Sequence, residues 1–228
     1  MSTGKRKKVA VQSKTAQLKK QYPGNRPIPP SKAVVIGTIV VAAIVCIILV
    51  IVFSERKAAL EPTAPQQTGL HYVDLETSMG TISLELNGDK APKTVTTFLE
   101  KVAAGAYDGL TFHRVMKGFM IQGGDPSGDG TGGTSVAFEN TGLSHVRGVI
   151  SMASSQAGVG QSDMQFFIMH GDGTHLDGLY AAFGRVTAGM DVVDRIATVE
   201  VGENPQNPKE LSSPITPITI TKATEVTH

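Results

Sequence analysis

One arginine, Arg114, has the residue type and the neighbours to act as a fixed cation in a site. It lies in the segment FHRVMKGFMIQGGDP, residues 112–126. On a strand, alternate side chains point to the same face, so Phe112 and Arg114 should share a face. Gln122 follows a turn at residues 116–118 and could orient Arg114 or a substrate carbonyl. A guanidinium carries five N–H donors and stays charged in proteins. We therefore take Arg114 as the candidate hydrogen-bond donor of the site, with Gln122 beside it.

Metal, thiol and phosphate chemistry are not indicated elsewhere. The six histidines show neither HxH nor HExxH spacing, and the single cysteine, Cys46, excludes an intrachain disulfide and a cysteine-based zinc site. Gly123, Gly124 and residues 130–133 should serve turns, because no helix start follows them to form a phosphate cradle. His113 is expected to be a hydrogen-bonded structural residue.

The elements that position Arg114 are predicted to be short strands. Residues 79–86 alternate apolar and polar side chains, as a half-buried strand does. Further apolar runs bounded by glycine lie at residues 111–115, 119–122, 148–153, 165–169, 181–186 and 215–221. Two helices are expected, at residues 91–105 and 189–198, and Pro92 suits the first turn of the first one. This pattern favours a mainly β fold, a closed antiparallel barrel without exposed sheet edges.

Residues 112–126 closely resemble the signature of cyclophilins, and the resemblance covers almost all of residues 70–226. It continues in family order through GTGGTS (130–135), FEN (138–140), RGVISMA (147–153), QFFI (165–168), LDG (176–178), FGRV (183–186) and GMDVVDRI (189–196). The resemblance implies an eight-stranded barrel capped by two helices. It also implies peptidyl-prolyl cis–trans isomerase activity that requires no cofactor and no metal.

The resemblance implies roles for individual side chains as well. Arg114 matches the residue that donates to the prolyl nitrogen of a twisted amide, and Gln122 accompanies it as the second catalytic residue. The positions that match the substrate-binding residues of the family are Phe112, Phe119, Met120, Ala153, Ser154, Gln165, Phe167, Leu176 and Tyr180.

The sequence departs from the family pattern at four positions. His175 stands where many members have a tryptophan that contributes to cyclosporin binding, so weak affinity for cyclosporin is expected. Tyr180 replaces a pocket histidine, as in bacterial-type relatives, and keeps an aromatic wall with a polar tip. Ser154 replaces a groove asparagine, and Met164 stands where serine is usual. These changes bear on which residue is preferred before proline.

A membrane anchor is predicted before the domain. Residues 33–53 contain no charge, and as a helix they would rise about 31 Å, enough to cross a hydrocarbon core of ~30 Å. Residues 1–32 hold nine Lys or Arg and no acidic residue, which should keep them in the cytoplasm. We therefore predict a basic, disordered tail at residues 1–32, a transmembrane helix at 33–53, an extended tether at 54–69 and an extracytoplasmic domain at 70–228, held at the cell membrane.

The formal net charge of +1 conceals two parts of opposite sign. Residues 58–228 hold ten basic and nineteen acidic residues, so no nucleic-acid partner is expected for the domain. The expected partners are proline-containing segments of unfolded or folding proteins and, through the anchor, membrane lipid. Two hypotheses remain: an isomerase that assists the folding of extracytoplasmic proteins, and a tethered, non-catalytic chaperone that only binds such segments.

Overall fold

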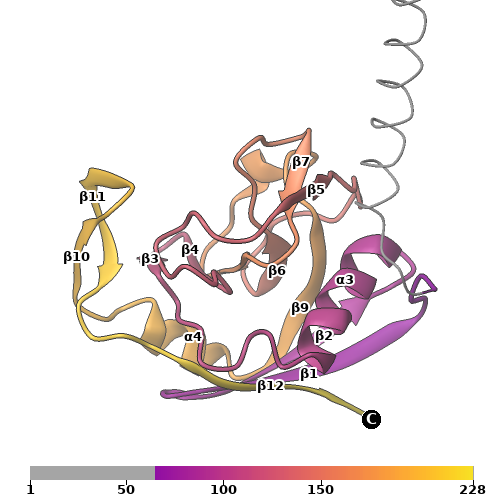
Figure 1. The fold of residues 1–228 in the computed structure, drawn as a ribbon, viewed down its shortest axis with the longest axis horizontal. Coiled ribbons are helices and arrows are strands. Elements are labelled where there is room, and N and C mark those ends of the chain that lie inside the picture. Colours follow the sequence, from indigo (N-terminus) through magenta and orange to yellow (C-terminus); the bar gives the residue numbers. More distant parts are fainter. Residues whose placement is uncertain (1–64, 228) are drawn as a thin grey trace, which may run out of the picture. The chain divides into compact units, whose positions relative to one another are not determined.

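A mainly antiparallel sheet, wrapped into a half-barrel, dominates the computed structural model, which describes residues 65–227 (Figure 1). The eight strands lie in the order β12-β1-β2-β9-β6-β8-β4-β3. In chain order they are β1 (Leu70–Thr77), β2 (Gly80–Asn87), β3 (Arg114–Met116), β4 (Met120–Gly123), β6 (Val149–Met152), β8 (Phe166–Met169), β9 (Ala182–Ala188) and β12 (Ile220–Val226).

Two small sheets accompany the half-barrel. Strand β5 (Ser135–Ala137) pairs with β7 (Gly160–Ser162), and β10 (Val201–Asn204) pairs with β11 (Asn207–Pro214). Figure 1 shows the β10–β11 hairpin standing apart from the main sheet, on the side of β3. The hairpin was not among the predicted strands.

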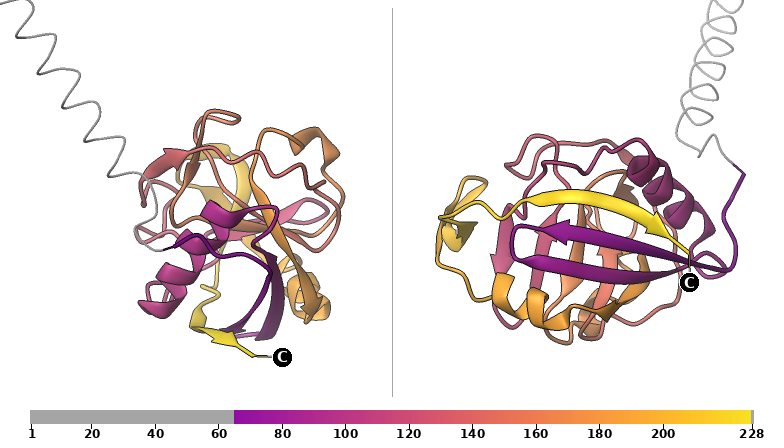
Figure 2. Two further views of the ribbon diagram at one scale, coloured as in Figure 1. Left: turned by 90° about the vertical axis from the view of Figure 1, so that its right-hand side faces the viewer. Right: turned by 90° about the horizontal axis from the view of Figure 1, so that it is seen from below.

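The two predicted helices are confirmed. α3 (Pro92–Ala103) has proline in its first turn and buries an apolar face that includes Val95, Phe98 and Val102. α4 (Met190–Ile196) begins after Gly189, whose φ of 86° is in the left-handed region that favours glycine. The two helices lie on opposite sides of the ribbon formed by β12, β1 and β2 (Figure 2).

The prediction of a closed barrel is wrong, because the sheet remains open between β12 and β3. Among the described residues, an isolated bridge between Thr111 and Thr219 spans this gap, next to a backbone hydrogen bond from Phe112 N to Ile218 O of 2.9 Å. The physical reason is the shortness of β3, which begins only at Arg114. The residues before β3 form backbone hydrogen bonds to the segment before β12 at only a few positions, so no continuous ladder of hydrogen bonds joins the two strands.

Aromatic side chains fill the interior of the half-barrel. Phe98 of α3 is fully buried, with its ring centroid 5.0 Å from that of Tyr107, 5.1 Å from Phe183 and 5.7 Å from Phe166. The Tyr107 hydroxyl donates to the Met164 carbonyl at 3.2 Å, which satisfies its one buried polar atom. The interior is therefore a packed core, and any substrate site must lie on the outer face of the sheet.

The predicted tail and transmembrane helix lie outside the described residues, as does most of the tether. No helix within residues 65–227 is long and apolar enough to cross a membrane. The last residues of the predicted tether contact the domain: Gln67 N donates to Thr96 Oγ1 and Gly69 N to Asp89 Oδ1, both at 2.8 Å.

Two glycines with nearly the same backbone conformation allow the packing around α4 to be tested. Gly189 has φ +86° and a Cβ there would overlap the Thr81 carbonyl, whereas Gly109 has φ +84° and open space around it. Gly109→Ala should lose about 1 kcal/mol of unfolding free energy from the left-handed backbone alone. Gly189→Ala should lose clearly more, measured by urea unfolding. Equal losses would show that β2 and α4 move apart freely.

Candidate active site

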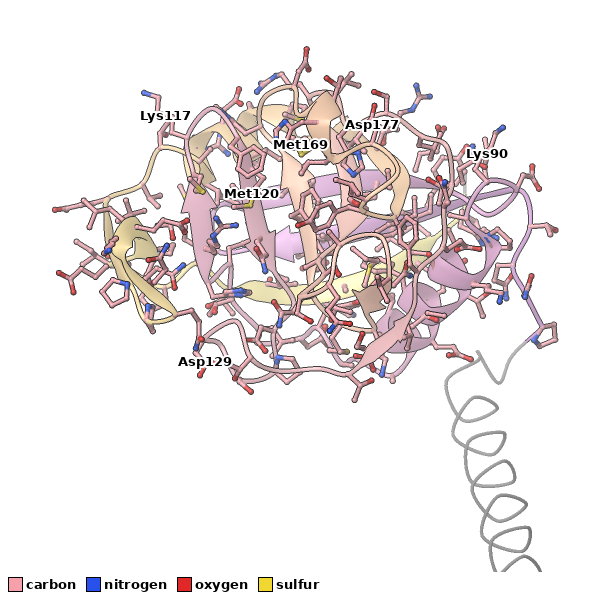
Figure 3. The ribbon with its side chains drawn as sticks, turned by 90° about the horizontal axis from the view of Figure 1, so that it is seen from above. Lys90, Lys117, Met120, Asp129, Met169 and Asp177 are labelled. Atoms are coloured by element: carbon pink, nitrogen blue, oxygen red, sulfur yellow. The ribbon has the colours of Figure 1, made fainter. Side chains whose placement is uncertain are left out.

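Successive apolar residues of β4 and β8 point to opposite faces of the sheet. Phe166 and Ile168 point into the core, whereas Phe167 and Met169 point to the opposite face. Met120 of β4 pairs directly with Met169 across the two strands and also lies on that opposite face (Figure 3). The result is a second apolar cluster outside the barrel core, made of Met120, Ala153, Phe167, Met169 and Leu176.

A cavity of about 230 Å³ opens above this second cluster. This volume is below the roughly 300–1,000 Å³ of sites for drug-sized ligands, and it suits one side chain or a small ring. Five of its nine lining residues are apolar, and Arg114 and Gln122 supply donors. The lining residues are Arg114, Phe119, Met120, Gln122, Ala153, Ser154, Phe167, Leu176 and Tyr180.

All nine lining residues are among the eleven proposed from the sequence. The tenth, Gln165, lines an adjoining cavity of about 200 Å³ that shares Gln122, Ala153 and Ser154 with the first. The eleventh, Phe112, is 1 % exposed and packs in the barrel core, edge-to-face with Phe166 at 6.2 Å. The structure therefore does not bring Phe112 into the cavity. Phe112 and Arg114 were expected to share a strand face, but Phe112 lies in the barrel core while Arg114 lines the cavity.

Aromatic rings make the walls rigid. Phe167 meets Tyr180 edge-to-face, with ring centroids 5.6 Å apart. Phe119 stacks on His175, with ring centroids 5.9 Å apart. His175 belongs to the short 3₁₀ helix η1 (Thr174–Leu176). Such contacts stabilise the pocket shape by about 0.5–1.5 kcal/mol each.

A buried histidine supports the cavity from behind. His145 is 0 % exposed and stacks on Phe167 at 6.0 Å. Its ring nitrogens lie 2.9 Å from Asp177 Oδ1 and 3.0 Å from Ser151 Oγ. Burial lowers the pKa of His145, and hydrogen bonds, first that of the Ser144 hydroxyl, lower the pKa of Asp177 to about 2. Two hydrogen bonds thus fix the imidazole, which supports the back of the Phe167 ring by stacking on it.

Arg114 is held by an acidic residue that the sequence analysis did not identify. Its Nε donates to Glu210 Oε1 at 2.7 Å and its Nη2 to Glu210 Oε2 at 2.9 Å. Nη2 also lies 3.2 Å from the sulfur of Met116. The hydrogen bond from Arg114 is the main reason that the pKa of Glu210 is lowered to about 2. The guanidinium side chain remains 28 % exposed at the rim of the cavity.

Gln122 does not orient Arg114, although the two residues face each other in the register of β3 and β4. Its Nε2 donates to Gln165 Oε1 at 3.0 Å. Gln165 in turn donates to the carbonyls of Gly132 at 2.8 Å and Gly130 at 3.2 Å. Gln122 is therefore fixed by the loop of the adjoining cavity rather than by the cation.

The expectation of a hydrogen-bonded His113 is wrong. Both ring nitrogens are buried, and neither has a partner within the part of the chain that the structure describes. Burial is the main cause that lowers the pKa of His113, and the Arg114 cation acts in the same direction. His113 lies beyond Arg114, in a hollow of about 280 Å³ that also includes Asp129, Gln206 and Glu210; Figure 3 labels Asp129.

Comparison with known proteins supports an isomerase. The sequence of peptidyl-prolyl cis-trans isomerase-like 1 of Rhizopus delemar is 47% identical over 139 residues, 58% of this chain and 83% of that protein. A peptidyl-prolyl cis-trans isomerase of Arabidopsis thaliana is 44% identical over 137 residues, 57% of this chain and 84% of that one. These relatives are eukaryotic and give no support to the bacterial-type likeness inferred from Tyr180.

The comparison with solved structures points to the same family as the sequence comparison. The crystal structure of a Cryptosporidium parvum cyclophilin type peptidyl-prolyl cis-trans isomerase is 30% identical, with a TM-score of 0.64, and the match covers 70% of this chain and 99% of that one. The same protein in the presence of the dipeptide Ala-Pro matches with a TM-score of 0.63.

The family described as "Cyclophilin type peptidyl-prolyl cis-trans isomerase/CLD" matches residues 72–225, which include all nine residues of the cavity. A small cavity with an apolar floor and a guanidinium at its rim is in keeping with that family. The chain belongs to the cyclophilin-type peptidyl-prolyl cis–trans isomerases.

Proposed function

We propose that the domain accelerates X–Pro isomerisation in folding extracytoplasmic proteins and that Arg114 stabilises the twisted prolyl amide. The cis and trans forms of an X–Pro bond differ by only about 0.5–1 kcal/mol. A barrier of ~18–20 kcal/mol separates them, because amide resonance is lost on rotation. Spontaneous exchange therefore takes tens of seconds and can limit folding.

The mechanism requires binding and one fixed charge. The proline ring occupies the apolar side of the cavity, between Met120, Phe167 and Leu176. When the amide twists, the prolyl nitrogen regains a lone pair, and Arg114 donates a hydrogen bond to it. Because the planar forms offer no such acceptor, the interaction favours the transition state over both ground states. The position of the guanidinium at the rim of this cavity is the observation that supports the proposal.

We further propose that residues 33–53 anchor the domain at the cell membrane, with residues 1–32 in the cytoplasm. The charge asymmetry supports this orientation, since residues 1–32 hold nine basic residues and no acid. The membrane lipid and the proline-containing segments of newly exported chains would then be the partners, and the site would work next to the membrane surface.

Arg114→Ala should reduce kcat/KM for cis–trans exchange of a proline peptide by about 100- to 1,000-fold, because a transition-state donor is lost. Exchange is measured by NMR line-shape analysis on the full-length protein in detergent micelles. Arg185→Ala is the control, since Arg185 is exposed and pairs with Glu85 at 2.9 Å away from the cavity. A wild-type protein that binds the peptide without accelerating exchange would instead be the tethered chaperone.

The rate per folded molecule should not change between about pH 6.5 and about pH 8.5, because the step transfers no proton. Glu210 has a pKa of about 2, below its ordinary 4.5, so its pairing with Arg114 contributes stability in full above about pH 4.5 and loses it as the pH falls through about 2. The measurement is kcat/KM against pH, with the folded fraction followed by circular dichroism. A bell-shaped profile centred near pH 7 would contradict the mechanism.

Protease added to intact cells should degrade the isomerase domain, whereas a cytoplasmic marker should stay intact until the membrane is permeabilised. An immunoblot against an epitope at the C-terminus follows the domain, and one against an N-terminal epitope follows the tail. Full protection of the domain in intact cells would reverse the proposed orientation.

A further inference from the structure

The guanidinium of Arg114 is held on one edge by a carboxylate from a distant part of the chain. Glu210 accepts hydrogen bonds from Nε at 2.7 Å and from Nη2 at 2.9 Å. This two-point arrangement fixes the plane of the guanidinium as well as its position. Both side chains are mostly buried, with 28 % of Arg114 and 20 % of Glu210 exposed. A surface ion pair of two mobile side chains would not have this geometry.

Glu210 is itself fixed by buried polar neighbours. Its Oε1 accepts a hydrogen bond from Ser212 Oγ at 2.6 Å and another from Asn204 Nδ2 at 3.1 Å. Ser212 is 0 % exposed and Asn204 8 %, and the two are bonded to each other at 3.0 Å. The carboxylate is therefore set in place before any substrate arrives, and its orientation does not depend on Arg114 alone.

The β10–β11 hairpin directs this carboxylate toward Arg114. Alternate residues of β11 point to one side, so Glu210 and Ser212 face Arg114 while Leu211 between them is 64 % exposed. Figure 1 shows the hairpin on the side of β3, the strand that begins with Arg114. The hairpin thus lies beside β3 and brings an acceptor to its first residue.

The ion pair leaves a defined part of the guanidinium for substrate. Nε and one hydrogen of Nη2 are engaged by Glu210, and Met116 sulfur lies against Nη2. Nη1 has no hydrogen bond or ion pair within residues 65–227. A guanidinium has five N–H donors in a rigid fork, so fixing one edge fixes the direction of the donors that remain.

We infer that Glu210 is a positioning residue of the isomerase: it holds Arg114 in the orientation in which its free N–H groups meet the twisted prolyl nitrogen. The inference rests on the catalytic role proposed for Arg114 and adds a second residue that acts only through it. The prolyl nitrogen is pyramidal only in the transition state, so the donor must already be in place. If the guanidinium had to reorient during the reaction, part of the transition-state stabilisation would be lost.

The test is a double-mutant cycle of Glu210→Gln and Arg114→Ala in the full-length protein. Glutamine has the size of glutamate but lacks its charge, and its amide nitrogen cannot accept a hydrogen bond. Glu210→Gln should lower kcat about tenfold, less than the roughly 100-fold that a 1 Å misplacement of a reacting group can cost, and should change KM by less than about twofold. In the Arg114→Ala background the same substitution should have no further effect on kcat.

Glu203→Gln is the matched control, because Glu203 is an exposed glutamate on the same hairpin and lines none of the three cavities. It should leave kcat and KM unchanged. An equal loss of kcat from Glu210→Gln in both backgrounds would overturn the inference, since Glu210 would then act independently of Arg114. A rise in kcat would also overturn it, because the ion pair would then restrain Arg114 away from the substrate.

A spectroscopic measurement separates this inference from the proposed function. The Arg114 Nε–H should give a resolved ¹H–¹⁵N signal with slow solvent exchange in wild type and in Glu203→Gln. Glu210→Gln should speed that exchange at least about tenfold while the backbone amide spectrum shows an intact fold. Unchanged exchange would refute the positioning role. An inactive wild type with a protected Nε–H would instead reject the catalytic proposal and leave the positioning of Arg114 intact.

If Glu210→Gln does not fold, Ser212→Ala provides the second variant. It removes one of the donors to Oε1 but keeps the carboxylate and its charge. We expect a smaller loss of kcat, about two- to threefold, with a matching, smaller increase in Nε–H exchange. If Ser212→Ala changed neither kcat nor the exchange rate of the Arg114 Nε–H, the fixed orientation of the Glu210 carboxylate would not contribute to catalysis, and the inference would be overturned.

Discussion

The two-residue alternation of β4 and β8 is the constraint on which the site depends. Each apolar residue of these strands belongs either to the barrel core or to the cavity floor, and neighbours in sequence are assigned to opposite sides. A shift of β8 by one residue would place Phe166 and Ile168 under the cavity and turn Phe167 and Met169 into the core. The aromatic cluster around Phe98 prevents such a shift, because Phe166 packs edge-to-face against Phe98 at 5.7 Å. Packing inside the barrel therefore determines the shape of the cavity outside it.

A second constraint concerns the charge. A guanidinium beside an apolar cavity loses part of its hydration, and a carboxylate at hydrogen-bond distance compensates for that loss. The carboxylate comes from a hairpin that lies beside β3, the last strand of the half-barrel. One small hairpin thus supplies the negative charge that pairs with the cation at the edge of the half-barrel.

The sequence predicted the parts that local pattern controls. The helices at Pro92–Ala103 and Met190–Ile196 follow from apolar periodicity and their flanking proline and glycine. The cavity residues followed from a family resemblance in which many short segments agree, and the alternation of β4 and β8 separates Met120 and Phe167 from the barrel core. Phe112 was misplaced because period-two reasoning assumes a strand, and β3 begins only at Arg114.

Glu210 could not be found in the same way. It lies 96 residues from Arg114, in a stretch, NPKELSSP, that has two prolines and no apolar alternation. The only local signal is the spacing of Glu210 and Ser212 by two, which indicates a shared strand face but names no partner. The open edge of the barrel was missed for a related reason, since the length of β3 depends on how its neighbours meet in space.

Both ends of the described chain leave the domain at one corner. Tyr72, near the start of β1, pairs with Val226 at the end of β12, and three strands separate β1 from β8 in the sheet (Figure 2). The two ends of the described residues therefore continue from strands that line none of the three cavities.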